Sequence, residues 1–90
     1  MSWKINYSRK AFKFAEQRGL YEPVEKRVCD FLRAYEKGMK LPDVKVLKGI
    51  WKGYFRVRYG DLRIIFDVDP ADKVVFIETI DYRGEVYKKK

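Results

Sequence analysis

The chain contains no histidine, a single cysteine and only two side-chain amides, Asn6 and Gln17. The absence of histidine removes the commonest metal ligand and the side chain that titrates nearest neutral pH. The single thiol, Cys29, can form no internal disulfide, so nothing favours an oxidising compartment. We therefore expect a cytoplasmic protein without metal or cofactor, in which any chemistry uses lysine, arginine, tyrosine or carboxylate side chains.

Long apolar runs are also missing. No stretch approaches the roughly 20 apolar residues that a membrane span requires, and residues 1–10 contain no signal-peptide core. These absences predict a soluble protein with no membrane partner, which is not exported through a signal peptide. Cys29 itself lies inside a helical pattern, and this favours a packing role over nucleophilic chemistry because no histidine is present to activate the thiol.

Positive charge and aromatic residues are abundant instead. The 90 residues are 47% hydrophobic and 17% aromatic, which is enough for one self-standing domain over residues 1–90 but not for two. Lysine and arginine number 21 against 13 aspartate and glutamate residues, a formal net charge of +8. Such a charge attracts polyanions, so nucleic acid is the expected partner. The alternative is a charge that only keeps the protein soluble.

Residue periodicity predicts an α+β fold. Residues 3–7 alternate between apolar and polar side chains, as in a half-buried strand. Capping residues and apolar residues at helical spacing then predict two helices, over Ser8–Arg18 and Pro23–Lys37. Runs rich in branched and aromatic residues predict three further strands, over Tyr54–Tyr59, Leu62–Val68 and Lys73–Tyr82. The expected order is β-α-α-β-β-β, with an antiparallel sheet, the first strand at its edge and both N-terminal helices packed on one face.

The dipeptide Gly60-Asp61 is a signal for a two-residue hairpin turn, and it sets the register of the flanking strands. Arg58 then faces Arg63, and Arg56 faces Ile65. One face of the hairpin is apolar, with Phe55, Val57, Tyr59, Leu62, Ile64 and Phe66, and the other carries Tyr54, Arg56, Arg58 and Arg63.

The three arginines on one face of this hairpin predict an anion site. Like charges directly opposite each other are destabilising, whereas guanidinium groups match phosphate oxygens. The alternative is a solvated surface. In that case Glu78, placed opposite Arg63 by a four-residue second loop, forms an ordinary surface ion pair.

Three segments resemble the RelE/ParE superfamily, the toxins of type II toxin–antitoxin systems. They are Leu47-Lys48-Gly49, then Gly53-Tyr54-Phe55-Arg56-Val57-Arg58-Tyr59-Gly60-Asp61-Leu62-Arg63-Ile64-Ile65-Phe66, and the ending Arg83-Gly84-Glu85-Val86-Tyr87. RelE-like members of this superfamily enter the ribosomal decoding site and cut mRNA, whereas ParE-like members inhibit DNA gyrase. A cognate antitoxin holds both kinds inactive.

The resemblance therefore implies a RelE-like mRNA interferase, a ribosome-dependent endonuclease. Its partners would be an acidic antitoxin, the ribosome and mRNA. Two alternatives stay open. One is a ParE-like inhibitor of DNA gyrase without nuclease activity, and the other is a relic or regulator that acts only by binding.

The same resemblance implies a set of site residues. The catalytic group would be Arg56, Arg58, Arg63, Arg83 and Tyr87, and the RNA-binding group would be Lys52, Tyr54, Tyr82, Lys88 and Lys89. Two departures from the family pattern affect this assignment. Arg56 and Arg58 stand where well-studied nucleases have lysines, and the family's second late arginine falls near Asp81, so Arg83 would act from a shifted place.

The resemblance does not assign the residue that transfers the proton. Because arginine is hardly deprotonated at neutral pH, Arg56 and Arg58 can stabilise a reacting phosphate but are poor general bases. Tyr87 would move a proton, stack on a base or simply pack, and Glu85 and Lys52 are weaker candidates for the base. Trp51 is expected to act as a lid over the core rather than as a stacking platform.

Overall fold

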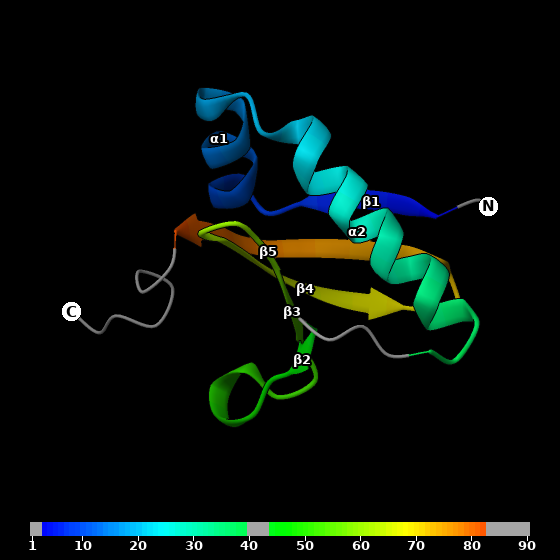
Figure 1. Cartoon of the computed structure of the whole chain (residues 1–90). Coiled ribbons are helices and arrows are strands. Elements are labelled where there is room, and N and C mark those ends of the chain that lie inside the picture. Colours follow the sequence, from blue (N-terminus) through cyan, green and yellow to red (C-terminus); the bar gives the residue numbers. More distant parts are fainter. Residues whose placement is uncertain (1–2, 40–43, 83–90) are drawn as a thin grey trace.

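A computed structural model describes residues 3–39 and 44–82, and within them two helices cover one face of a five-stranded sheet (Figure 1). The elements in chain order are β1 (Lys4–Tyr7), α1 (Arg9–Arg18), α2 (Tyr21–Glu36), β2 (Lys45–Val46), a 3-10 turn (Gly49–Trp51), β3 (Phe55–Tyr59), β4 (Leu62–Asp69) and β5 (Val74–Tyr82). The strand order is β1-β5-β4-β3-β2. The α+β fold, the helices on one face and the first strand at an edge are confirmed.

The buried core lies between the helices and the inner face of the sheet. Ala11 and Ala15 of α1 and an apolar stripe on α2 join one cluster with residues of β3, β4 and β5. The predicted apolar face of the hairpin belongs to this core, although Phe55 is only half-buried and Tyr59 is exposed at the end of β3. Neither α1 nor α2 is long and apolar enough to cross a membrane.

Local signals explain where the helices begin and end. Ser8 caps α1 by accepting a hydrogen bond from the Ala11 N–H at 3.0 Å, and α1 ends at Gly19 in the left-handed conformation with φ of 63°. The second helix begins at Tyr21, two residues before the predicted start at Pro23. Proline is tolerated there because the first four N–H groups of a helix have no intrahelical partner.

The sheet differs from the expected antiparallel sheet in two respects. β1 pairs with β5 in parallel, with Ile5 opposite Val75, so the sheet is mixed. Two helices and the hairpin separate β1 from β5 in the chain, and the turn chemistry that predicts hairpins says nothing about such a distant pair. The sequence also did not predict β2, because its two residues, Lys45 and Val46, are too few for an alternating pattern.

The register between β4 and β5 corrects the expected position of Glu78. Asp69 pairs with Val74, so the connecting loop begins after Asp69, whose carboxylate accepts hydrogen bonds from the N–H groups of Ala71 and Asp72 at 3.1 and 3.2 Å. Further along, a β-bulge leaves Glu78 as an extra residue in β5. As a result Asp81, and not Glu78, lies opposite Arg63.

Candidate nucleic-acid interface

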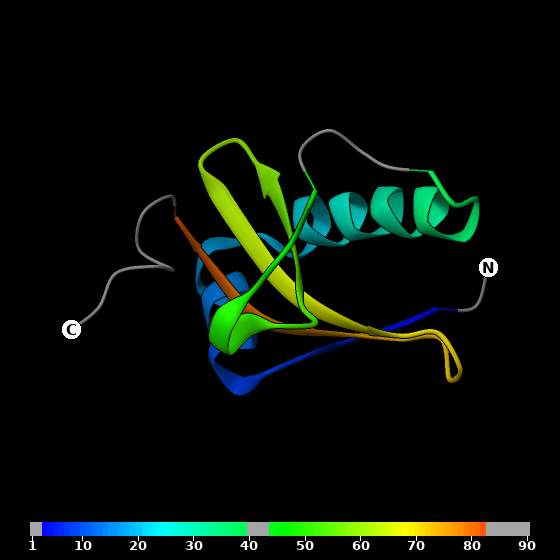
Figure 2. The ribbon, with the colours of Figure 1, turned by 90° about the horizontal axis from the view of Figure 1, so that it is seen from below.

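The predicted arginine cluster lies on the face of the sheet opposite the helices. Figure 2 looks at the sheet from its β2–β3 edge, with α2 on one side of it. The pairing of β3 with β4 confirms the predicted register, with Arg58 opposite Arg63 and Arg56 opposite Ile65. Gly60 has φ of 61°, as the first residue of the two-residue turn requires. We call this surface the arginine face, defined by Tyr54, Arg56, Arg58, Arg63, Ile65, Thr79 and Asp81.

Two rows of side chains cross the arginine face. The first row runs through Arg58, Arg63 and Asp81 on three successive strands. The second runs through Lys45, Arg56, Ile65 and Thr79. Because neighbouring strands lie about 4.8 Å apart, each row brings two cationic groups within the reach of one phosphate. Asp81 is the carboxylate of the first row, and its Oδ1 accepts a hydrogen bond from the Tyr82 N–H at 2.8 Å.

Two side chains of the arginine face other than the arginines are buried. Ile65 is fully buried although it points away from the helices, and Thr79 is 5% exposed. The Nε atoms of Arg56 and Arg63 are themselves buried, which places the stems of both side chains against the sheet. Arg58 is exposed at the end of the row. The aliphatic parts of these two arginine side chains are therefore packed, which restricts where their guanidinium groups can lie.

The structure brings Tyr54 and Lys52 to one end of the arginine face. Tyr54 precedes β3 and alternates with Arg56 and Arg58, so it belongs to the same side of the strand. Its half-buried ring meets Trp51 edge-on, with 5.5 Å between ring centroids. Lys52 is exposed in the same loop. The contact between Trp51 and Tyr54 places Trp51 beside the arginine face rather than in the core cluster between the helices and the sheet.

Tyr82 lies on the other side of the sheet. It pairs with Leu62, a core residue, and its ring centroid lies 5.6 Å from that of Phe14 in α1. Tyr82 therefore is not grouped with the arginines, unlike the other RNA-binding candidates that the structure describes. The remaining predicted site residues lie outside the described residues: Arg83, Glu85, Tyr87, Lys88 and Lys89.

Sequence reasoning missed Asp81 as the cross-strand neighbour of Arg63. No local signal could have found it, because its position depends on the length of the β4–β5 loop and on the bulge at Glu78. Chemically the first row combines two guanidinium groups, which only donate hydrogen bonds, with one carboxylate, which only accepts them when ionised. Such a set can bind and stabilise a phosphate and places a proton acceptor nearby.

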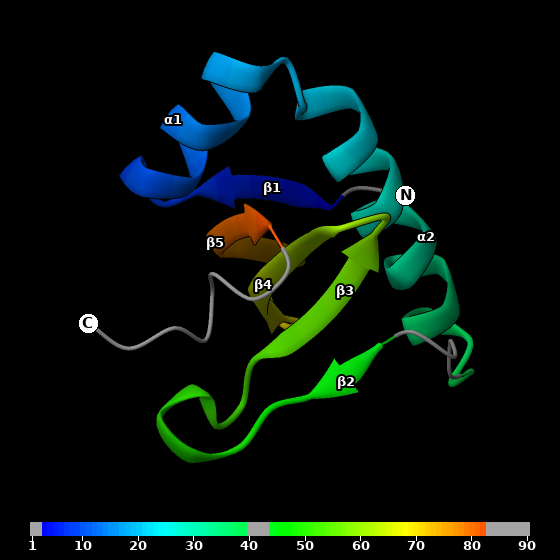
Figure 3. The same ribbon diagram turned by 60° about the vertical axis from the view of Figure 1, so that its left-hand side comes forward.

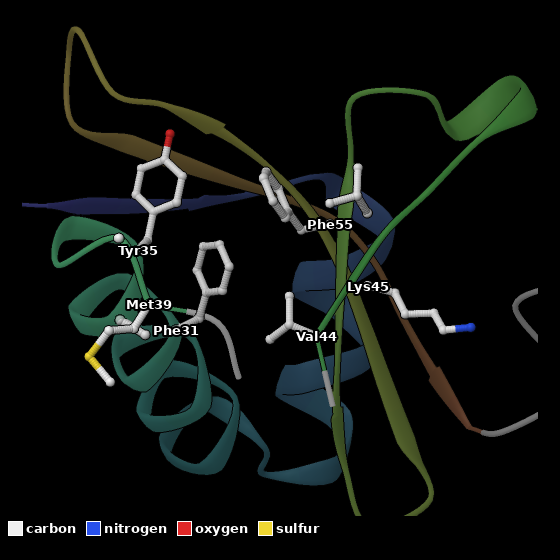
Figure 4. Close-up of a pocket in the computed structure, with 9 residues that line it drawn as sticks. Phe31, Tyr35, Met39, Val44, Lys45 and Phe55 are labelled. Atoms are coloured by element: carbon white, nitrogen blue, oxygen red, sulfur yellow. The ribbon is translucent and has the colours of Figure 1, made fainter. Parts of the chain in front are cut away.

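A separate apolar groove lies between α2 and the β2–β3 edge of the sheet (Figure 4). Its volume is about 590 Å³. Phe31 and Tyr35 line it from the helix, and Val44 and Phe55 line it from the sheet, whereas Lys45 points the other way. Met39, also in the lining, is 59% exposed. This groove is suited to apolar side chains and not to a phosphate.

Comparison with known proteins assigns the chain to a family. Residues 5–87 match the model of the family described as ParE toxin of type II toxin–antitoxin system, parDE. No curated protein matches the sequence.

Several solved structures share the fold. A chain of the RelBE2 toxin–antitoxin complex from Mycobacterium tuberculosis is 23% identical, with 92% of this chain and 100% of that chain covered and a TM-score of 0.67. YafQ from E. coli is 21% identical, with 97% and 100% covered and a TM-score of 0.61. A chain of the archaeal RelE–RelB complex from Pyrococcus horikoshii OT3 is 24% identical, with 94% and 99% covered and a TM-score of 0.64. Because the family match spans nearly the whole chain, the protein belongs to the ParE toxin family and is the toxin component of a type II toxin–antitoxin system.

Proposed function

We propose that this toxin is a ribosome-dependent mRNA endonuclease that holds the reacting phosphate on its arginine face. The observation that carries the proposal is the direct opposition of Arg58 and Arg63 across β3 and β4, with Arg56 on the same face. Opposed like charges destabilise a sheet, so the arrangement favours an anionic ligand on this face. A bound phosphate supplies negative charge and accepts hydrogen bonds from guanidinium groups.

The reaction we propose is attack of the ribose 2′-oxygen on the adjacent phosphorus. The bond from phosphorus to the 5′-oxygen breaks, leaving a 2′,3′-cyclic phosphate and a free 5′-hydroxyl. The 2′-hydroxyl gives up a proton, and the 5′-oxygen takes one. Arg56, Arg58 and Arg63 would stabilise the charge on the pentacoordinate phosphate. Tyr87, with Arg83, would complete the catalytic group from the C-terminal segment.

An acidic antitoxin is the proposed regulatory partner. Two of the structures that share the fold are complexes described as toxin–antitoxin or RelE–RelB complexes. The net charge of +8 favours fast association with an acidic chain. The apolar groove beside α2 would receive the antitoxin's apolar side chains, because it exposes Met39 and Val46 next to the buried Phe31.

A second candidate function is inhibition of DNA gyrase without nuclease chemistry. The matching family is named for ParE, and the arginine face lacks the lysines that the family resemblance implies for well-studied nucleases. In this case the arginine face would bind an acidic protein surface or DNA phosphates and no bond would break.

Parallel assays on purified protein separate the two functions. We expect the wild type to cleave mRNA on programmed ribosomes under single-turnover conditions and to leave gyrase supercoiling unchanged. Arg58→Ala should lose cleavage, whereas the control Arg9→Ala, which removes an exposed arginine from α1, should keep it. Inhibition of gyrase with no cut in ribosome-bound mRNA would replace the nuclease proposal by the gyrase proposal.

A further inference from the structure

The loop that joins β2 to β3, residues 47–54, is a structured projection from the sheet. Figure 3 shows it extending away from α2 at the end of the β2–β3 pair. The Leu47 N–H donates to the Tyr54 carbonyl at 2.9 Å, and the Tyr54 N–H donates to the Trp51 carbonyl at 3.0 Å. Gly49 and Gly53 have φ of 70° and 91°, backbone conformations that residues other than glycine rarely adopt. These hydrogen bonds and glycine conformations define the path of the loop backbone.

The tip of this loop exposes one large apolar side chain beside two half-buried aromatic rings. Ile50 is 87% exposed, more than any other large hydrophobic side chain among residues 3–39 and 44–82. Trp51 and Tyr54 form an edge-to-face pair beside it, with an interplanar angle of 83°. Ile50 and the accessible parts of the two rings together give the loop an apolar surface.

The charge around the loop is of one sign. Every charged residue between Val44 and Gly60 is a lysine or an arginine: Lys45, Lys48, Lys52, Arg56 and Arg58. Lys48 and Lys52 are exposed and flank the apolar tip on both sides. Cations interleaved with aromatic rings are the combination that binds single-stranded nucleic acid, because the cations take phosphates and the rings stack on bases.

The loop continues the arginine face. Tyr54 stands on the same side of the strand as Arg56 and Arg58, and a strand rises about 3.3 Å per residue, so Tyr54 lies about 13 Å along the chain from Arg58. An RNA strand with one phosphate between Arg58 and Arg63 can therefore run along β3 and reach Trp51. The loop would contact nucleotides beyond the reacting phosphate and not the phosphate itself.

We propose that residues 48–54 form a second RNA-binding subsite, which receives an unpaired base on Trp51 and Tyr54 and the flanking phosphates on Lys48 and Lys52. Ile50 covers the edge of the bound base. This inference rests on the proposed nuclease function. The ligand of this subsite is an unpaired stretch of RNA, which either the mRNA or the ribosomal RNA can supply. The subsite raises affinity and leaves the chemical step unchanged.

The test uses fluorescence anisotropy with a labelled 12-nucleotide RNA whose 2′-hydroxyls are methylated, so that it cannot be cut. Trp51→Ala and Ile50→Ser should weaken binding, the former by about 5- to 150-fold. The double variant Lys48→Ala/Lys52→Ala should weaken binding and lower the slope of log K against log salt by about 1.4. The matched control, Lys10→Ala/Lys13→Ala on α1, should change neither quantity. Trp51→Phe keeps a ring and should retain most of the affinity. Circular dichroism checks that each variant is folded.

Binding to vacant ribosomes identifies the source of the RNA, and binding to the antitoxin tests for a protein contact instead. If the loop variants bind the 12-mer normally but bind vacant ribosomes more weakly, the subsite is supported with ribosomal RNA as its ligand. If they bind both normally, the proposal is overturned. Normal RNA binding together with weakened antitoxin binding would overturn it in favour of a protein contact.

The nuclease function and the subsite can fail separately. Wild-type cleavage with no effect of the loop variants on binding removes only the subsite. Absence of cleavage by the wild type removes the nuclease proposal on which the subsite rests.

Discussion

Arg58 and Arg63 stand directly opposite each other on β3 and β4, and Asp81 continues the same row on β5. This arrangement contains one repulsive and one attractive neighbour for Arg63. A surface pair between Arg63 and Asp81 would contribute about 0–1 kcal/mol, and the repulsion from Arg58 is of similar size and opposite sign. Within this row the two effects nearly cancel, so the row itself is expected to add little to the stability of the fold.

The first prediction concerns Arg63→Ala. We expect this variant to lose toxicity while its melting temperature stays unchanged or rises slightly, because the lost attraction to Asp81 is offset by relief of the repulsion from Arg58. Growth after induction and thermal denaturation measure the two effects. Arg63→Lys keeps the positive charge but cannot bind a phosphate through two parallel N–H groups, so it tests whether toxicity needs the charge alone or the guanidinium geometry. A clear drop in melting temperature would show that Arg63 is kept for structure.

The second prediction concerns Tyr87, which lies outside the described residues. If its hydroxyl moves a proton or holds the phosphate, Tyr87→Phe should slow cleavage by about 10²- to 10⁴-fold while ribosome binding is retained. Single-turnover cleavage on programmed ribosomes by the wild type, Tyr87→Phe and Tyr87→Ala makes the measurement. Full activity in the Phe variant together with loss in the Ala variant would assign Tyr87 to stacking.

The third prediction concerns Ser8, which joins α1 to the bulge in β5. Its Oγ donates to the Glu78 carbonyl at 2.7 Å and accepts from the Ala11 N–H at 3.0 Å. Ser8→Ala removes both bonds and should lower the free energy of unfolding by about 1–2 kcal/mol, or the melting temperature by about 4–16 °C.

Two other substitutions at Ser8 separate its hydrogen bonds. Ser8→Thr keeps both and should melt near the wild type. Ser8→Asp keeps only the cap acceptor and should melt between the wild type and Ser8→Ala. Equal melting temperatures for the Ala and Thr variants would contradict the role given to the hydroxyl.

The fourth prediction concerns acid stability and Glu36 at the end of α2. The hydrogen bond from Trp3 Nε1 to Glu36 Oε2, 2.7 Å long, lowers the pKa of Glu36 below its ordinary value of 4.5, and Lys73 Nζ at 3.6 Å adds to the effect. Since the folded-state pKa is the lower one, the stabilisation is present above pH 4.5 and is lost as the pH falls through the folded-state pKa. In the Glu36→Gln variant the melting temperature should therefore fall less steeply than in the wild type as the pH is lowered below 4.5. If the melting temperatures of the Gln variant and the wild type fell equally steeply at acidic pH, the stabilising role given to the Glu36 contacts would be contradicted.

The sequence by itself determined the features that depend on neighbouring residues. The Gly60-Asp61 turn pairs strands residue by residue, so the opposition of Arg58 and Arg63 could be read directly, and with it the arginine face. Ser8 and Gly19 likewise marked the ends of α1. These elements are predictable because the conformational preferences that form them act within a few residues.

Only the tertiary structure decided how distant segments meet. The parallel pairing of β1 with β5 joins residues some seventy positions apart, and it depends on how the helices pack on the sheet rather than on a turn. The bulge at Glu78 shifts the register of β5 by one residue, which puts Asp81 beside Arg63 and turns Tyr82 toward Phe14. Because side chains alternate with a period of two, a one-residue shift exchanges the faces of a strand. The carboxylate neighbour of the arginines therefore could not be identified before the packing of β5 was known.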